Sequence, residues 1–336
     1  MSQPQDRRPR SPFATAAIVA VATVILQALL VPLFAAPAAN LAPRDLPVVV
    51  AGPDQAAEGV VRRLQADDPK AFDITVMPDA AAADQKLRDR EAYAAIVVTP
   101  GGAELHTATA ASPIVAALLT QASTQLGDGQ QVRVVDVVPG DPDDPRGSGF
   151  AAGFLPLLLT SMVAGILFSL LVRSRWGQLA GLLTYGILAG LVGAAVLQQW
   201  LGVIPGDYLT NAAAIALLAT AAAATLAGLA ALLGRAGIAL GALLVFLLGN
   251  PLSAVTAAPE LLPRPWGEVG QWLPAGAGGS LLRSTAFFDG AGATRPLWIL
   301  AGYAVVGLLL VAVGRVSPAA ATAAAHRTPA AAAARQ

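Results

Sequence analysis

The sequence has no cysteine, and among its 336 residues it has only two histidines and two lysines. Without cysteine, the chain cannot form a disulfide, a thiolate metal site or a cysteine nucleophile. Charged residues are also scarce, at 12% of the chain against about a quarter in an ordinary soluble protein. Because the net charge is zero, the electrostatics of the chain gives no reason to expect nucleic acid as a partner.

Long apolar runs are abundant instead, and 55% of the residues are hydrophobic. A helix needs about 20 apolar residues to cross the hydrocarbon core of a bilayer. Six segments reach or approach that length: 13–36, 150–172, 177–197, 211–233, 236–256 and 297–314. Asn250 and Pro251 interrupt the fifth, because proline removes a helical hydrogen-bond donor. The sequence therefore predicts an α-helical, polytopic membrane protein with about six transmembrane helices.

Arginines indicate the orientation, because basic residues in short loops stay on the cytoplasmic side. With six spans, four groups of arginines fall on one side: Arg7, Arg8 and Arg10; Arg173 and Arg175; Arg235; and Arg315, Arg327 and Arg335. We therefore expect a multi-pass protein of the plasma (cell) membrane with both termini in the cytoplasm. Residues 1–12 form the cytoplasmic N-terminus, and the alanine-rich segment 315–336 is predicted to be a disordered cytoplasmic tail.

The first apolar segment has two interpretations. An arginine-rich start, an apolar run and an alanine-rich end also describe a cleaved signal peptide. The run of about 24 residues exceeds the 7 to 15 of a signal sequence, which favours an uncleaved anchor. In either case the segment that follows lies outside the cytoplasm.

Residues 37–149 form the predicted extracytoplasmic domain, since they hold most of the acidic residues and only short apolar runs. Strand-like segments are 46–52, 73–78, 93–99, 103–109 and 131–139, and helix-like segments are 55–66, 80–91 and 113–126. Pro100, Gly101 and Gly102 mark a hairpin. Strands alternating with helices predict a small α/β domain, inserted between the first and second transmembrane helices.

No catalytic constellation is recognisable. His106 has no serine, cysteine or acidic partner in a known motif, so we assign it no role. Asp141, Asp143 and Asp144 could hold a divalent cation, although the surrounding prolines favour a simple turn. Motifs of nucleotide-binding loops, zinc proteases and serine hydrolases do not occur in a fitting context. We therefore expect no enzyme, no catalytic residue, no cofactor and no metal site.

The predicted spans carry no ionisable residue in their interiors, where ion-coupled transporters usually have one. Small residues at spacing four, Gly186 with Gly190 and Gly237 with Gly241, would let helix backbones approach closely. This pattern predicts a packed helix bundle.

Residues 257–296 form an unusual segment before the last span. Three prolines break its beginning, two tryptophans suit a membrane interface, and 280–288 can form a short amphipathic helix. Irregular backbone at membrane depth must line a cavity or be buried. The segment is therefore either a re-entrant outer gate or a loop resting on the headgroups. The candidate gate residues are Asn250, Pro251, Trp266, Trp272 and Arg283.

Two stretches resemble a known family. VVDVVPGDPDDPRGSGFAAGFLPLLLTSMVAG (134–165) is similar to the re-entry segment of actinobacterial ABC type-2 exporter permeases. The segment from Gly249 to Gly290 is similar to the one between their last two helices. Within that family, the layout most resembles the YhgE/phage-infection-protein branch. The resemblance implies that two copies form the membrane path of an exporter, driven by a separate ATPase subunit.

Two functional hypotheses follow. In the first, the chain is a permease subunit that moves a hydrophobic or amphipathic molecule outward. In the second, it is a non-transporting membrane protein whose outer domain binds envelope components or a partner protein. The short 173–176 loop offers little surface for an ATPase, and no feature names the cargo.

Overall fold

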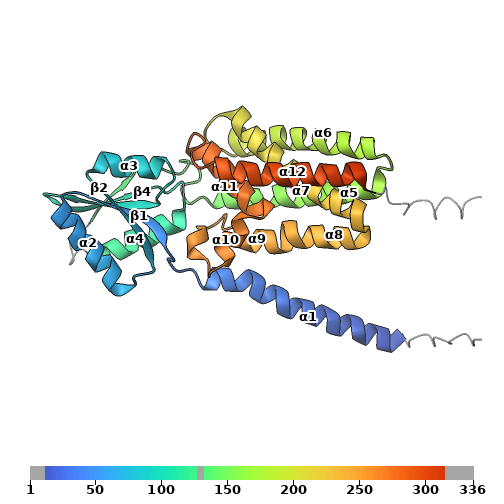
Figure 1. Ribbon diagram of the computed structural model, residues 1–336, viewed down its shortest axis with the longest axis horizontal. Helices are drawn as coiled ribbons and strands as arrows, with labels where there is room; N and C mark the ends of the chain where they lie inside the picture. The colour runs from blue at the N-terminus through green and yellow to red at the C-terminus, as the bar shows by residue number, and fades with distance from the viewer. Residues whose placement is uncertain (1–11, 127–131, 315–336) are drawn as a thin grey trace, which may run out of the picture.

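The computed structural model describes residues 12–126 and 132–314, so the two predicted cytoplasmic ends lie outside the described residues apart from Pro12. It has two parts, a helix bundle and a sheet domain at one end of that bundle (Figure 1). The first helix starts and the last helix ends at the bundle end opposite the sheet (Figure 1).

Six helices are long and apolar enough to cross a membrane, as predicted. They are α1 (Pro12–Ala39), α5 (Ser148–Leu171), α6 (Arg175–Ala194) with a π-helical extension (Ala195–Trp200), α7 (Tyr208–Leu233), α8 (Arg235–Ala242) extended to Leu252, and α12 (Thr294–Val313). In the described spans, charged side chains occur only in the first two residues, at Arg175, Arg235 and Arg295. These six helices indicate a multi-pass membrane protein.

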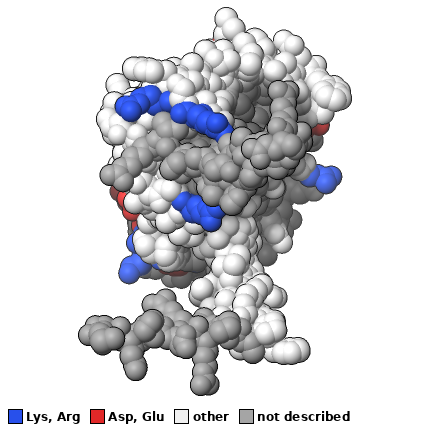
Figure 2. All heavy atoms as spheres, turned by 90° about the vertical axis from the view of Figure 1, so that its right-hand side faces the viewer, with Lys and Arg blue, Asp and Glu red and all other residues white. Residues whose placement is uncertain are grey.

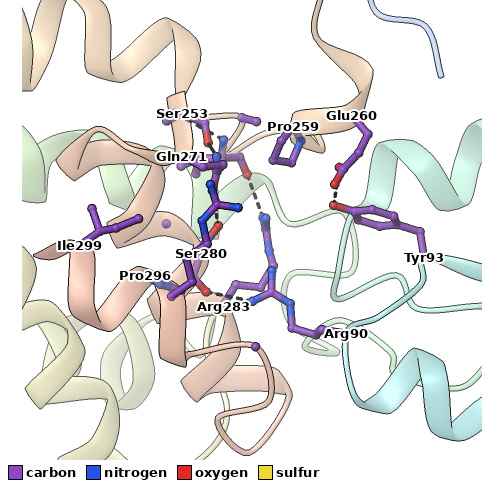
Figure 3. Close-up of a pocket in the computed structure, with 15 residues that line it drawn as sticks. Arg90, Tyr93, Ser253, Pro259, Glu260, Gln271, Ser280, Arg283, Pro296 and Ile299 are labelled. Atoms are coloured by element: carbon purple, nitrogen blue, oxygen red, sulfur yellow. Dashed lines mark hydrogen bonds between the residues drawn. The ribbon is translucent and has the colours of Figure 1, made fainter. Parts of the chain in front are cut away.

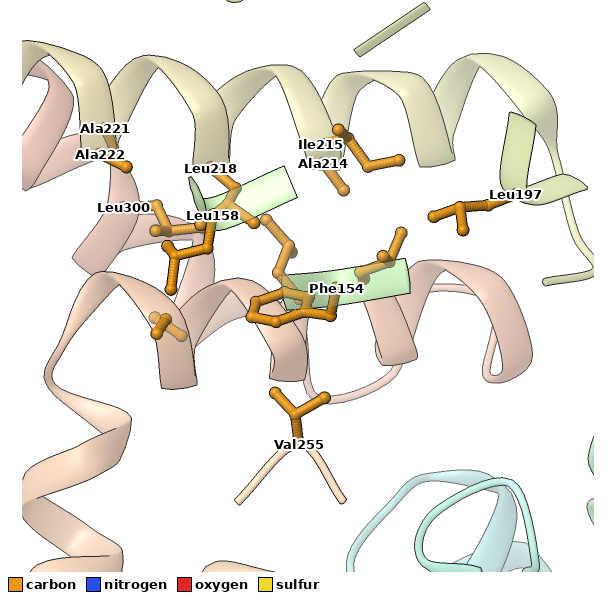
Figure 4. Close-up of a cluster of buried hydrophobic side chains, with 14 of the residues drawn as sticks. Phe154, Leu158, Leu197, Ala214, Ile215, Leu218, Ala221, Ala222, Val255 and Leu300 are labelled. Atoms are coloured by element: carbon orange, nitrogen blue, oxygen red, sulfur yellow. The ribbon is translucent and has the colours of Figure 1, made fainter. Parts of the chain in front are cut away.

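Helix α7 is the centre of the bundle, and α5, α6, α8, α12 and the shorter α11 (Pro274–Phe287) all pack against it. Its residues Ala221 to Ala224 are fully buried. Around them, Phe154 and Leu158 of α5 and Leu300 of α12 meet Leu218 of α7 (Figure 4). Lipid tails are as apolar as these side chains, so close packing rather than the hydrophobic effect holds such helices together.

The predicted glycine pairs lie at helix contacts. A β-carbon on Gly190 would lie 2.3 Å from the carbonyl oxygen of Ala212 in α7, and one on Gly186 would meet Thr220. Gly237 and Gly241 of α8 also face α7, against Leu229 and Leu226. The prediction of a packed bundle is confirmed.

The fifth span ends at Leu252, four residues before the predicted end at 256. A π-helical turn (Leu243–Leu248) is followed by one α-helical turn, α9 (Gly249–Leu252). Proline at 251 removes the amide donor that would bond four residues back, at Leu247, which lies in this π-helical turn. The helix therefore runs through Asn250 and Pro251 and stops just beyond them, rather than breaking at them.

Helix α1 stands apart from the bundle (Figure 1). None of its residues is buried, whereas the other five spans are all partly buried. It approaches the bundle at α9, near its own C-terminal end. Apart from a few residues towards that end, the residues of α1 are exposed in the described chain.

The sheet domain follows α1. Its strands are β1 (Leu46–Ala51), β2 (Phe72–Met77), β3 (Ala94–Thr99), β4 (Gly102–Thr107) and β5 (Arg133–Asp136), in the order β2-β1-β3-β4-β5. Only β3 and β4 run antiparallel, joined by the predicted hairpin, with Thr99 opposite Gly102. The helices are α2 (Asp54–Asp67), α3 (Ala80–Arg88) and α4 (Pro113–Leu126). The predicted alternation of strands and helices is confirmed.

The two faces of the sheet bury alternate residues of each strand, as the period of two requires. Val49 and Ala51 face α3, where Leu87 is buried, whereas Leu46 and Val48 face α4 and Val115. Each face also contacts the segment before α12. Phe288 joins the α3 side, and Ala257, Ala258 and Leu261 join the α4 side. The segment before α12 therefore contributes buried side chains to both faces of the sheet, and these contacts attach the sheet domain to the bundle.

The segment before the last span is folded and largely buried. It contains a 3₁₀ turn (Pro259–Leu261), α10 (Trp266–Gln271) and α11 (Pro274–Phe287). Helix α11 packs on α7 and α12, and eleven of its fourteen residues are buried, including Arg283. The short amphipathic helix expected over 280–288 is therefore the second half of a longer helix, and this helix is buried within the protein. The glycines and alanines of PAGAGG allow α11 to enter the bundle, where it has no exposed face.

Candidate functional site

A cavity of about 270 Å³ lies where the sheet domain meets the bundle, and we call it the junction cavity. Its charged and aromatic lining comes from four places. Arg90 and Tyr93 lie just before β3, Glu260 lies in the 3₁₀ turn and Arg283 lies on α11 (Figure 3), and Arg295 is the second residue of α12. Segments nearly 200 residues apart in the sequence are brought together here.

The three arginines share one arrangement, because each guanidinium lies over an aromatic ring. Arg90 lies 5.3 Å from the ring centre of Phe288, Arg283 lies 4.9 Å from Phe150, and Arg295 lies 4.9 Å from Trp272. Stacking of this kind is attractive and fixes the plane of the guanidinium. This stacking uses the face of each guanidinium and leaves its edge, where the N–H donors lie, free to bind a group in the cavity.

Two of these arginines also bind the backbone around the cavity. Nη2 of Arg283 donates to the carbonyl oxygen of Val255 at 2.8 Å, and Nη1 of Arg90 donates to that of Ser280 at 3.0 Å and to the hydroxyl of Ser284. Arg90 thereby ties the sheet domain to α11. In the described ranges, neither these two nor Arg295 forms an ion pair.

Burial opposes the charge of the arginines. It lowers the pKa of Arg283 to about 10, with the positive charge of Arg90 as a second cause, and it lowers the pKa of Arg90 as well. With a pKa of about 10, Arg283 stays protonated near neutral pH. Burial also raises the pKa of Tyr93, which keeps its hydroxyl neutral so that it donates to Glu260 at 2.8 Å. Glu260, the one carboxylate in the lining, therefore already accepts a hydrogen bond from Tyr93.

Backbone strain gathers at the same junction. The non-glycine residues with positive φ in the described chain are Asp45, Arg90, Ala254 and Asp289, at 51°, 58°, 54° and 49°. Arg90 and Ala254 line the junction cavity, Asp45 lines the neighbouring cavity, and Asp289 follows α11. A left-handed conformation costs about 1–2 kcal/mol for a residue with a β-carbon, and such strain often accumulates at functional sites.

A second cavity of about 230 Å³, which we call the α1 crevice, lies between the end of α1 and the bundle. Phe34, Pro37 and Ala38 line it from α1, and Ala151 and Phe154 line it from α5. It shares the segment Ser253 to Val255 with the junction cavity. A mostly apolar cavity and a basic cavity are therefore immediate neighbours.

The five predicted gate residues fall in different places. Asn250 and Pro251 line the α1 crevice, and Arg283 lines the junction cavity. Trp272 holds Arg295 at the rim of that cavity, whereas Trp266 is half exposed at the start of α10 and lines neither cavity. Four further lining residues were not predicted from the sequence, because their proximity depends on how the sheet domain docks on the bundle: Arg90, Tyr93, Glu260 and Arg295.

The other candidates have structural surroundings. Nδ1 of His106 lies 2.6 Å from Oδ1 of Asp84, an acidic partner that sequence motifs did not identify, and its Nε2 lies 3.6 Å from Glu104. Asp144 accepts hydrogen bonds from the Phe150 amide and the Ser148 hydroxyl, at 2.8 and 3.2 Å. It thereby caps the start of α5, which agrees with the prediction of a turn. Among the described residues, no group of three acidic or histidine side chains could hold a metal ion.

Compared with protein-family models, with curated proteins and with solved structures, this chain has no match. A functional assignment therefore depends on the geometry of the chain itself.

Proposed function

We propose that this protein is a permease subunit of the plasma membrane that moves a hydrophobic or amphipathic molecule outward. The observation that supports this proposal most is the α1 crevice, an apolar cavity between a detached helix and a packed bundle. Such a cavity is accessible to a lipid-like molecule from the side of the protein.

The passage we propose runs beside α1 rather than through the bundle. Helices α6 and α12 contact the backbone of α7 so closely that a β-carbon on Gly190, Gly228 or Gly307 would lie within 2.6 Å of backbone atoms. A cargo molecule cannot pass between helices in such contact. The exposed surface of α1 leaves room for the cargo, the lipid bilayer or a second copy of the chain.

Arginines support the proposed orientation. Figure 2 shows the bundle end opposite the sheet domain, where basic side chains are exposed. The connections there and the helix starts that follow them hold Arg173, Arg175 and Arg235 and no acidic residue. Under the positive-inside rule this end is cytoplasmic, and the sheet domain then lies outside the cell.

The energy source of the proposed export is a separate question. The resemblance implies an ATPase subunit and a second copy, yet the cytoplasmic connections in the described chain are short. Only Val172 to Ser174 join α5 to α6, and only Gly234 joins α7 to α8. An ATPase partner would therefore have to contact the helix ends or chain segments outside the described ranges.

The test uses inside-out vesicles from the native cell, in which outward transport appears as uptake. A strain lacking the gene is complemented with the wild type or with a variant carrying Ala38→Cys and Thr256→Cys, two positions that line the α1 crevice. Since the chain has no cysteine of its own, a bismaleimide reagent should bridge only this pair.

With ATP present, vesicles with the wild type should accumulate a fluorescent phospholipid, and bridging should abolish the uptake. Each single-cysteine variant treated with the same reagent is the control and should remain active. Equal uptake by vesicles with and without the protein would refute the proposal, and full uptake after bridging would refute the passage beside α1.

A second candidate function is ligand binding by the sheet domain without transport. An apolar cavity of about 330 Å³ lies between the sheet face, α2 and α4, lined by Val48, Ile96, Leu105 and Leu119. If this function holds, the full chain in nanodiscs should bind a fluorescent long-chain fatty acid more tightly than empty nanodiscs do. Equal signals from both would refute it.

A further inference from the structure

We propose that the junction cavity binds the phosphate group of an amphipathic molecule through Arg90, Arg283 and Arg295. The inference rests on the proposed function for the kind of molecule carried, but phosphate binding itself can be measured without transport. The argument depends on charge, on unused hydrogen-bond donors and on the neighbouring apolar crevice.

The charge of the lining is unbalanced. Three arginines face the cavity with one carboxylate, Glu260, which gives a net charge of +2. Arg283 is only 7% exposed and, like Arg90, has no ion-pair partner in the described part of the chain. Buried charges in proteins are normally paired, because removing them from water is costly. A bound anion would supply the missing partner.

The arginines also retain donors for such an anion. A guanidinium has five N–H donors, yet the hydrogen bonds that Arg90 and Arg283 make to described residues use a single nitrogen of each, Nη1 and Nη2 respectively. Their stacking on Phe288 and Phe150 keeps the planes fixed. Planar, fixed forks of donors match the tetrahedral oxygens of phosphate and bind them in pairs.

The size and position of the cavity favour a phosphate that carries an apolar group. About 270 Å³ is more than one phosphate fills, so the cavity has room for part of a headgroup. Ser253 to Val255 separate it from the α1 crevice, whose lining is mostly apolar. A phosphate bound among the arginines would therefore lie next to a mostly apolar cavity, on the side of the junction cavity that faces α1.

The experiment measures binding to the purified full chain in detergent by native mass spectrometry. One arm titrates dioleoyl phosphatidylglycerol and the other titrates glycerol phosphate, so the two arms separate a lipid headgroup from a soluble phosphate. Replacing Arg283 or Arg295 by glutamine should weaken binding by about tenfold each, as expected for a lost charge-assisted hydrogen bond. Arg283→Lys keeps the charge and should lose less.

The matched control is Arg264→Gln. Arg264 lies at the same junction, but it lines the neighbouring cavity and already pairs with Asp45. This variant should bind the phospholipid like the wild type. Arg295 is exposed, so its replacement should not impair folding, and thermal unfolding of each variant checks this.

Tight binding of the lipid with weak binding of glycerol phosphate supports a lipid phosphate, and tight binding of both supports the shared phosphate chemistry. Lack of binding in both arms, or equal losses in Arg264→Gln and Arg295→Gln, overturns the proposal. Binding that depends on the arginines in a protein that fails the uptake assay would refute the proposed function while leaving this inference intact.

Discussion

Replacing Gly307 by alanine should separate the two helices that pack most extensively in the bundle, α7 and α12. A β-carbon at position 307 would lie 2.5 Å from the carbonyl carbon of Ala224 and 2.6 Å from the amide nitrogen of Thr225. These are backbone atoms, so no side chain can rotate away, and α12 must move outward by roughly 1 Å to restore an ordinary contact of about 3.5 Å.

That displacement has a predictable cost. A radial gap of about 0.5–1 Å forfeits a quarter to a half of the dispersion energy of the atom pairs it opens, and overpacking of this kind typically costs about 1–3 kcal/mol. In a bilayer, packing is the main attraction between helices, so little else offsets the loss. We expect Gly307→Ala to lower the free energy of unfolding by about 1–3 kcal/mol.

The matched control lies one and a half turns earlier on the same helix. A β-carbon on Gly302 would meet no atom within 4 Å, so Gly302→Ala should be neutral or stabilising by up to about 1 kcal/mol through helix propensity. Both variants are compared with the wild type by SDS titration, with tryptophan fluorescence as the signal. If Gly307→Ala were as stable as Gly302→Ala, the close contact of α7 and α12 would be refuted.

A double variant makes the test sharper. A β-carbon on Gly228 of α7 would lie 2.6 Å from the carbonyl oxygen of Gly307, so both substitutions strain one crossing point. Once the helices have separated for the first substitution, the second should cost less. The combined loss in Gly228→Ala with Gly307→Ala should thus be smaller than the sum of the single losses.

Three further predictions concern the sheet domain and the junction, and thermal unfolding of the full chain measures each. Asp144→Ala removes the cap of α5 and should lower the free energy of unfolding by about 1 kcal/mol. Asp143→Ala, at an exposed position, should lower it by less than half of that. Equal losses would contradict the capping role. Asp84→Ala leaves the Nδ1 atom of buried His106 without its partner and should cost about 1–3 kcal/mol; an unchanged transition would show that water replaces the carboxylate. Ala254→Gly relieves a left-handed backbone and, after the entropy of glycine is subtracted, should stabilise by about 0.5–1 kcal/mol; destabilisation would contradict the strain.

Local sequence patterns predicted the elements of this fold well. The strands and helices of the sheet domain lie within a few residues of their predicted positions, because alternating and helical spacing depend only on neighbours in the chain. The six spans were predicted equally well, because length and apolarity can be determined from the sequence without knowing how the helices pack.

Helix α11 was predicted less well, for a physical reason. Arg283 in an otherwise apolar stretch suggests a short amphipathic helix in an interfacial or re-entrant segment. In the structure Arg283 is buried. Its guanidinium stacks on Phe150 and donates a hydrogen bond to the carbonyl oxygen of Val255. Those partners come from other elements, so the sequence around position 283 does not reveal them.

The candidate site was predictable only in part. The sequence selected the segment 250–292 and Arg283, but Arg90 lies in the short connection between α3 and β3, where a basic residue is unremarkable. Its position at the cavity results from the docking of the sheet domain, through Phe288 on one face of the sheet and Leu261 on the other. Docking depends on long-range contacts, which local periodicity does not specify.

The three arginines lie on three separate parts of the chain, and this has a consequence for the proposed function. Arg90 belongs to the sheet domain, Arg283 to α11 and Arg295 to the start of the last span. A phosphate bound among them would attract all three, so it would stabilise the docked arrangement over one in which the sheet domain moves away. By reciprocity, a movement that withdraws Arg90 must weaken phosphate binding. If the protein exports an amphiphile as proposed, release would therefore require no ionisable group within the spans, because separation of the sheet domain from α11 would suffice.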